Sequence, residues 1–214
     1  MNTSSPRLQA NAWIALLAFV ALSAGAVFAV LREQQRPAIP NLIWPDPPTL
    51  GAFSLSMADG ATLNQDSLKG HWTLLFFGFT HCPDVCPNTL SVLKQTTQRL
   101  ADDPLYRAHG QVVFVSVDPE RDQPAALAKY VHYFNPQFLA ATGPAAALAD
   151  LTRPLGVIHA RVPLAGEEYS FDHTASIFLI DPALRLLGVW SLPHDAETIS
   201  TAFRQISAFG AQNP

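Results

Sequence analysis

The sequence predicts an α/β domain built on a mixed central sheet, and three observations support this prediction. Residues 73–79 and 111–118 are almost continuously apolar, as is typical of strands that are buried on both faces of a sheet. Segments with helical periodicity follow both of these runs, and this alternation indicates parallel βαβ units. Residues 175–180 and 184–190 are predicted to form a late strand pair joined as a hairpin, which makes the sheet mixed.

An uncharged apolar segment at residues 12–31 comes before this domain. As a helix of about 20 residues it would be about 30 Å long, which is the thickness of a bilayer core. A secretory signal peptide is the alternative, but its apolar core usually has only about 7–15 residues. We therefore predict a membrane anchor at residues 12–31, after a tail at residues 1–11, with the following domain exported. A cytosolic domain on a membrane tether remains an alternative.

The segment that follows is rich in proline. The sequence contains 18 prolines, and they are crowded between Pro37 and Pro48. Proline-rich segments are extended and stiff, so residues 32–49 are predicted to be a linker. One folded domain is then predicted over residues 50–214, which is an ordinary size for a single domain.

The first elements predicted in this domain are a hairpin, a strand and a helix. Residues 51–64 alternate loosely between apolar and polar and contain the turn signal Asp59-Gly60, which predicts a β-hairpin. The buried strand at residues 73–79 follows. Residues 89–100 carry apolar side chains at helical spacing and are predicted to form a helix.

The second part of the domain begins with the strand at residues 111–118, which ends in the turn sequence "DPERD". Residues 124–134 place their apolar side chains on one helical face, and residues 145–151 read as a shorter helix. A strand is predicted at residues 157–162, before the late strand pair. An amphipathic helix at residues 196–209 is the last predicted element.

The charge of the chain excludes one class of function. The net charge is −4 and the isoelectric point is about 5.9. The sequence has no run of lysine and arginine that would form a phosphate-binding stripe. We therefore expect no nucleic-acid partner.

Both cysteines of the chain, Cys82 and Cys86, lie between the first buried strand and the next predicted helix. Ligands of open α/β folds gather at this junction, and a helix N-terminus there lowers the pKa of a thiol. The thiolate is the form that attacks disulfides and binds metals. A mixed sheet with a cysteine motif at this junction looks like the thioredoxin fold.

Three uses of the cysteine pair remain open on these grounds. A structural disulfide would close a loop of about five residues and stabilise by only about 2 kcal/mol, against about 4.7 kcal/mol for a 100-residue loop. A redox pair is the second use, although thioredoxins have one residue fewer between their cysteines. A metal site is the third, because two thiolates suit Cu(I) or Zn, and it requires a third ligand.

His173 is the candidate for this third ligand among the seven histidines. It stands just before a predicted core strand, and in a thioredoxin-like sheet that loop lies beside the cysteine motif. From its position alone, His173 is as well explained as a residue without a functional role as it is as a metal ligand. Asp172 could orient the ring, or it could be a surface residue. Asp118, after a core strand, could approach the site, or it could shape the turn before Pro119.

Three segments carry a family resemblance. In this order, "GFTHCPDVCPNTL", "VSVDPERD" and "DHTASIFLID" resemble the SCO/SenC family of membrane-anchored copper proteins, over roughly residues 50–210. The resemblance implies a thioredoxin-like domain with an added N-terminal β-hairpin. The cysteines of the family motif match Cys82 and Cys86, and its metal-binding histidine matches His173. It therefore implies a copper ion held by two thiolates and one imidazole. The ion is expected to be Cu(I), and Cu(II) is a second possibility.

The same resemblance implies a function. A member of this family is expected to deliver copper to the dinuclear copper site of cytochrome c oxidase during assembly, as a metallochaperone and not as an enzyme in the strict sense. The alternative is a thiol-disulfide oxidoreductase that reduces the copper-site cysteines of the oxidase before metallation. A peroxidase-like thiol enzyme is disfavoured, because the nearest arginine in sequence, Arg99, lies far into the predicted helix.

Partners and location follow from the same resemblance. The expected partners are the copper-site subunit of cytochrome c oxidase, other periplasmic copper carriers and thioredoxin-like reductants. The expected location is the inner membrane, crossed once, with the folded domain in the periplasm.

Overall fold

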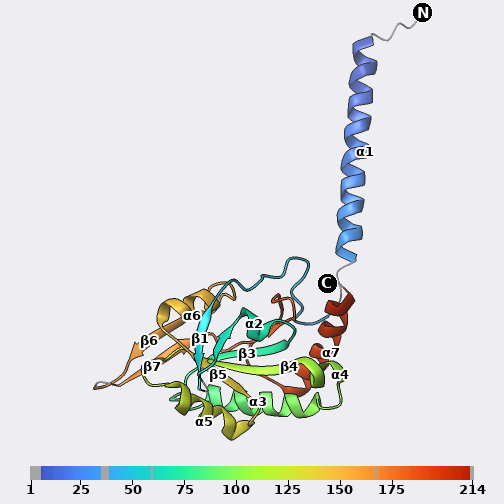
Figure 1. Cartoon of the computed structure of the whole chain (residues 1–214). Coiled ribbons are helices and arrows are strands. Elements are labelled where there is room, and N and C mark those ends of the chain that lie inside the picture. Colours follow the sequence, from blue (N-terminus) through green and yellow to red (C-terminus); the bar gives the residue numbers. More distant parts are fainter. Residues whose placement is uncertain (1–5, 35–38, 59, 167, 213–214) are drawn as a thin grey trace, which may run out of the picture. The chain divides into compact units, whose positions relative to one another are not determined.

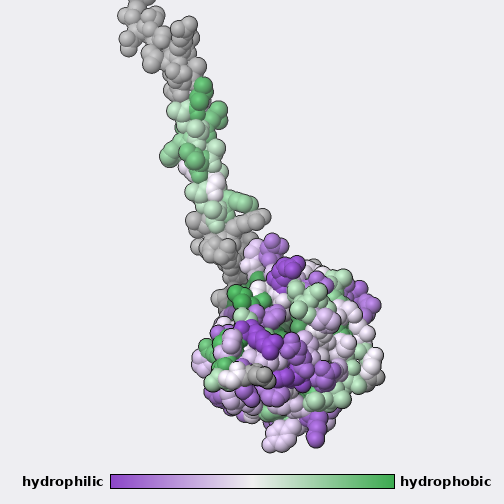
Figure 2. All heavy atoms as spheres, turned by 90° about the vertical axis from the view of Figure 1, so that its left-hand side faces the viewer, coloured by the Kyte–Doolittle hydropathy of each residue, from purple (hydrophilic) through white to green (hydrophobic). Residues whose placement is uncertain are grey.

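The computed structural model describes residues 6–34, 39–58, 60–166 and 168–212, and the chain divides into two compact units (Figure 1). The first unit contains the helix α1 (Pro6–Gln34), whose described side chains are exposed and mostly apolar (Figure 2). Among the described residues, no helix combines the length and apolar character needed to cross a membrane. The anchor predicted at residues 12–31 is therefore not confirmed.

The second unit begins at Ile39, earlier than predicted. The segment after Ile39 joins the edge of the domain, where Leu42 forms an antiparallel bridge with Gly188. Backbone pairing therefore ties the second half of the segment predicted as a linker, residues 32–49, to the sheet. Residues 35–38 of this predicted linker lie outside the described residues.

The central sheet of this unit has seven strands in the order β2-β1-β5-β4-β3-β8-β9. The strands are β1 (Ser54–Met57), β2 (Thr62–Asn64), β3 (Trp72–Gly78), β4 (Gly110–Ser116), β5 (Leu139–Thr142), β8 (Ile177–Ile180) and β9 (Leu186–Trp190). β3, β4 and β5 are parallel to one another, whereas β1, β2, β8 and β9 pair in antiparallel fashion. The mixed sheet and the N-terminal hairpin of the prediction are thus confirmed.

Helices cover both faces of this sheet (Figure 1). They are α2 (Gln65–Leu68), α3 (Val85–Arg99), α4 (Pro104–His109), α5 (Pro124–Phe134), α6 (Ala145–Thr152) and α7 (Ala196–Gln212). α3, α5 and α7 pack against alternate sheet residues such as Phe76 and Phe114. α2 and α6 pack on the other face against residues such as Phe77 and Val115. Every residue of β3 is buried, which explains its continuous apolar sequence.

A separate two-stranded ribbon is formed by β6 (His159–Pro163) and β7 (Tyr169–His173). In Figure 1 it is the orange pair of arrows that lies apart from the central sheet. The strand predicted at residues 157–162 corresponds to β6, but β7 was not predicted. The segment before β8, which was expected to be a loop, therefore contains the strand β7, and His173 is the last residue of β7.

Candidate metal centre

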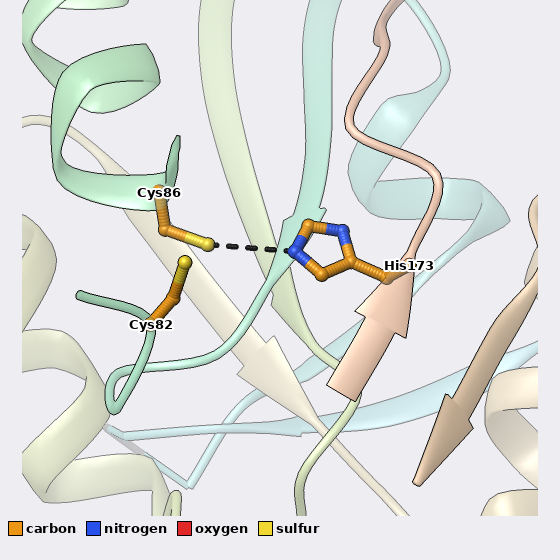
Figure 3. A group of neighbouring side chains, drawn as sticks. All are labelled: Cys82, Cys86 and His173. Atoms are coloured by element: carbon orange, nitrogen blue, oxygen red, sulfur yellow. Dashed lines mark hydrogen bonds between the residues drawn. The ribbon is translucent and has the colours of Figure 1, made fainter. Parts of the chain in front are cut away.

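The site lies where β3 ends and α3 begins. Cys82 lies in the loop between these elements, and Cys86 lies in the first turn of α3. Figure 3 shows the two sulfur atoms facing each other, with the ring of His173 reaching them from the end of β7. Sequence segments that are distant along the chain therefore meet at one point.

The first turn of α3 explains the local sequence. Asp84 occupies the N-cap position, so Pro87 is the third residue of the helix. A proline is tolerated there because the N–H group of that position has no partner within the helix. Pro83 precedes the cap, and so does Cys82. The sulfurs are therefore brought together by the loop before the helix and not by helical spacing.

Gly78 allows Cys86 to pack on the end of β3. A Cβ atom at position 78 would lie 2.7 Å from Cys86 Sγ and 2.8 Å from a ring carbon of Phe114. Both distances are shorter than real carbon contacts, so a larger residue would displace the thiol or the ring. The absence of a side chain at Gly78 lets the Cys86 thiol lie fully buried against the sheet.

The ring of His173 is held with its Nε2 atom towards the thiols. Nε2 lies 3.6 Å from Cys86 Sγ, and Nδ1 lies 3.1 Å from the backbone carbonyl oxygen of Thr174. Because a carbonyl oxygen only accepts, Nδ1 carries a hydrogen, and Nε2 is the ring nitrogen that faces the thiols. Phe79 and Phe76 pack edge-on to this ring, with centroid distances of 5.8 Å and 6.3 Å. The imidazole is thus oriented with Nε2 towards the thiols.

The two aspartates predicted to support the site have other positions. Asp172 is exposed and lies on the opposite side of β7 from His173, because successive strand residues alternate. The carbonyl of Thr174 contacts Nδ1 of His173 and can orient the ring, so the role suggested for Asp172 stays a prediction. Asp118 is buried and accepts hydrogen bonds from Arg121 Nε and from the Tyr169 hydroxyl. It shapes the turn that follows β4, which was the alternative reading.

Asp122 supports the cysteine loop and was missed by the sequence analysis. Its buried carboxylate accepts hydrogen bonds from the backbone N–H and the hydroxyl of Thr80, and from the hydroxyl of Ser116. Thr80 lies just before the cysteine motif, so this carboxylate fixes the loop that carries Cys82. The available signal was a second aspartate in the "DPERD" turn after a buried strand.

The two thiols have opposite pKa shifts. A hydrogen bond from the Cys86 thiol lowers the pKa of Cys82 to about 3, partial burial opposes this shift, and a hydrogen bond with His173 adds to it. The same hydrogen bond, together with burial, raises the pKa of Cys86. The pair therefore holds one proton at neutral pH. Cys82 is the half-exposed thiolate and Cys86 is the buried thiol.

This arrangement predicts the pH dependence of alkylation. The alkylation rate of Cys82 is expected to stay nearly constant from about pH 8 down to about pH 5, because the thiolate persists above its pKa of about 3. Iodoacetamide labelling followed by mass spectrometry measures this rate. In Cys86→Ala the main lowering interaction is lost, so the rate should fall about tenfold for each pH unit below the restored pKa. A tenfold fall per unit in the unmodified chain would contradict the prediction.

The three side chains fit a copper ion. The two sulfurs and the His173 nitrogen all lie within 4.8 Å of one another. A trigonal ion with metal–ligand distances of about 2.0–2.3 Å needs its ligand atoms about 4 Å apart, so only small movements are required. Two soft thiolates and one imidazole suit Cu(I), and Zn has similar preferences. In the described part of the chain, no other group of three such side chains has this geometry.

Comparison with protein families gives one match over most of the chain. The model described as SCO1/SenC matches residues 45–208. The mitochondrial SCO2 homolog of Bos taurus is 37% identical over 156 residues, which is 72% of this chain and 58% of that protein. An SCO2-like protein of Rickettsia prowazekii is 34% identical over 72% of this chain and 75% of its own length. The matched region thus spans less than two thirds of the bovine protein.

Solved structures share the fold. The copper-bound ScoI of Arabidopsis thaliana has a TM-score of 0.67 and 30% identity, over 73% of this chain and 99% of that chain. Another structure, with 21% identity and a TM-score of 0.61, covers 78% of this chain and 98% of its own. It is described as a member of the Sco family of cytochrome c oxidase assembly proteins, with a disulfide switch. At that identity the likeness shows the fold alone.

Proposed function

Since the chain belongs to the SCO1/SenC family, we propose that it binds copper through Cys82, Cys86 and His173 and delivers it to the dinuclear copper site of cytochrome c oxidase. The observation that carries this proposal is the convergence of two sulfurs and a ring nitrogen within 4.8 Å. The copper bound in the Arabidopsis relative, which is 30% identical to this chain, supports it.

The unequal burial of the ligands suggests how copper would leave. Cys86 is fully buried, whereas Cys82 is half-exposed, so an acceptor thiolate can approach the ion from the side of Cys82. Copper would then pass by exchange of one thiolate for another, with no change in its oxidation state. Binding requires both thiols deprotonated and the imidazole neutral, so copper affinity should decrease in acid. Release to the acceptor returns a proton to Cys86.

A transfer experiment tests the proposal. The chain is loaded with one equivalent of Cu(I) without oxygen and mixed with the reduced copper-site domain of a cytochrome c oxidase. After separation, metal analysis should find the copper on the acceptor. Cu(I)–glutathione at the same concentration is the control carrier. Transfer no faster than from Cu(I)–glutathione, or retention of copper by the chain, would contradict delivery.

Reduction of the oxidase cysteines is a second candidate function. The opposite pKa shifts of Cys82 and Cys86 support it. The Cys82 thiolate could attack an acceptor disulfide, forming a mixed disulfide and releasing one acceptor thiolate. Cys86, once deprotonated, would then attack Cys82, forming the chain's own disulfide and releasing the second acceptor thiolate. Two electrons pass to the acceptor in this exchange.

His173 distinguishes these two functions. Disulfide reduction needs only the thiols, whereas copper binding also needs the imidazole. The His173→Ala chain should therefore still reduce an oxidised acceptor domain while losing copper transfer. If acceptor reduction were lost together with copper transfer, this separation of roles would fail.

Location and partners belong to the same proposal. We place the domain outside the cytoplasm, on a single inner-membrane crossing formed by the uncharged segment at residues 12–31, with periplasmic copper carriers and thioredoxin-like reductants as further partners. Mitochondrial and bacterial relatives support a compartment where oxidase is assembled. Protease treatment of spheroplasts should degrade the domain, and full protection would argue for a cytosolic domain.

A further inference from the structure

The ring of Tyr169 lies between two guanidinium groups at the start of β7. The central carbon of Arg121 is 3.7 Å from the ring centroid, and that of Arg161 is 3.5 Å away. Two guanidinium groups this close to one centroid would collide on one face, so they occupy opposite faces of the ring. Each contact is a close cation–π interaction.

Carboxylates and backbone groups complete this stack. The Tyr169 hydroxyl donates to Asp118 at 3.0 Å, and Arg121 Nη1 donates to the Tyr169 carbonyl oxygen at 3.0 Å. Arg161 pairs with Glu120 at 3.1 Å, and Arg121 pairs with Asp118. We call these five residues the clasp. It joins both strands of the β6–β7 ribbon to the turn at residues 118–122.

The clasp and His173 lie on the same ribbon. Tyr169, Phe171 and His173 alternate along β7 and therefore point to the same side. Phe171 packs against Phe79, which also packs against His173, with centroid distances of 5.7 Å and 5.8 Å. Among the described residues, the ribbon forms a sheet separate from the central one, so side-chain contacts of this kind can contribute to where His173 lies.

The same turn also holds the cysteine loop. Asp122, at its end, accepts hydrogen bonds from the N–H and hydroxyl groups of Thr80, which lies two residues before Cys82 in the chain. One turn of five residues, 118–122, therefore contacts the thiolate half of the site through Asp122 and the imidazole half through the clasp.

We propose that Tyr169 is a positioning residue for copper, because the clasp sets the place of His173 relative to the cysteine loop. This inference rests on the proposed function, in which His173 is a copper ligand. The clasp does not touch the ion. It acts by holding the imidazole at the distance from the thiols that binding requires, so that little binding free energy is spent on ordering the ribbon.

Replacing Tyr169 tests the inference. Tyr169→Ala removes both stacking contacts and should lower Cu(I) affinity about tenfold, measured without oxygen against a competing chelator on the full chain. Tyr169→Phe keeps the ring between the guanidinium groups and should recover most of the affinity. Tyr133→Ala is the matched control, because Tyr133 is 84% exposed and lies on α5, and it should leave affinity unchanged.

A double-mutant cycle separates positioning from general destabilisation. In a His173→Ala background there is no imidazole to position, so Tyr169→Ala should cause no further loss of Cu(I) affinity. An equal loss in both backgrounds, or no loss in either, would overturn the inference. If His173→Ala alone left affinity unchanged, the proposed function would fail instead.

Arg161→Ala provides a second route if Tyr169→Ala does not fold. The Arg161 side chain is 50% exposed, so its removal should have little effect on the thermal unfolding of the metal-free chain. It removes one face of the stack and should lower Cu(I) affinity about threefold, again only when His173 is present. Unchanged affinity in this variant would count against the clasp as a positioning element.

Discussion

Replacement of Cys82 by serine is expected to lower Cu(I) affinity by at least about a thousandfold, which would be the largest effect of any substitution considered. A serine hydroxyl is a hard oxygen donor that remains protonated at neutral pH, so it cannot replace a thiolate on a soft ion. Anaerobic titration against a chelator specific for Cu(I) measures the loss. Because Cys82 is half-exposed, thermal unfolding of the metal-free chain should change little.

The Cu(I) affinity of the Cys82→Ser chain tests the whole proposed site and not only Cys82. Full copper retention by the Cys82→Ser chain would mean that the two thiolates do not hold the ion together, and the whole proposed site would fall. Cys86→Ser is a weaker first test, because that side chain is fully buried and packed against Gly78 and Phe114, so a change in fold could imitate a change in binding.

Replacement of His173 by alanine is expected to lower Cu(I) affinity about a hundredfold and to leave two-coordinate binding by the thiolates. The ring supplies the nitrogen that faces Cys86 at 3.6 Å, and alanine offers no donor in its place. The same chelator competition measures the change, and X-ray absorption should show the nitrogen ligand lost.

His159 offers a matched control for this substitution. It is paired directly opposite His173 in the β6–β7 ribbon, but it is outside the group of three potential ligands. His159→Ala should therefore change Cu(I) affinity much less than His173→Ala. Equal losses in the two variants would show that the ribbon tolerates neither change, and His173 would lose its assignment as a specific ligand.

Much of the fold could be predicted because its strands differ in sequence character. The buried strand β3 is continuously apolar, and this pattern identified it directly. β5 has the sequence "LAAT", whose alanines carry no strand signal, so it was missed. β7, "YSFDH", was missed because polar residues interrupt it. The separate ribbon that it forms with β6 was therefore missed too, since pairing cannot be read from one segment alone.

The site was predictable to a different extent. Cys82 and Cys86 were recognised at a strand–helix junction, and His173 became the candidate third ligand from its position before a core strand. The family resemblance then implied its role as a ligand. The structure brings the three together, while their roles as ligands remain a prediction. The contact of Asp122 with Thr80 could not be predicted, because the two residues lie 42 positions apart and only the fold makes them neighbours. The Thr174 carbonyl carries no sequence signal, since every residue has one.

The turn at residues 118–122 has a mechanical consequence. The loop that carries Cys82 and the ribbon that carries His173 are both attached to it, so we expect a small shift of the turn to move these two side chains in the same direction. Such a common displacement would leave the distance between Cys82 and His173 unchanged. The distance between the two ligands increases only when one of the two attachments breaks and the other holds. The geometry of the copper site would then be little affected by motions of the rest of the domain. Loss of one attachment alone would separate the ligands.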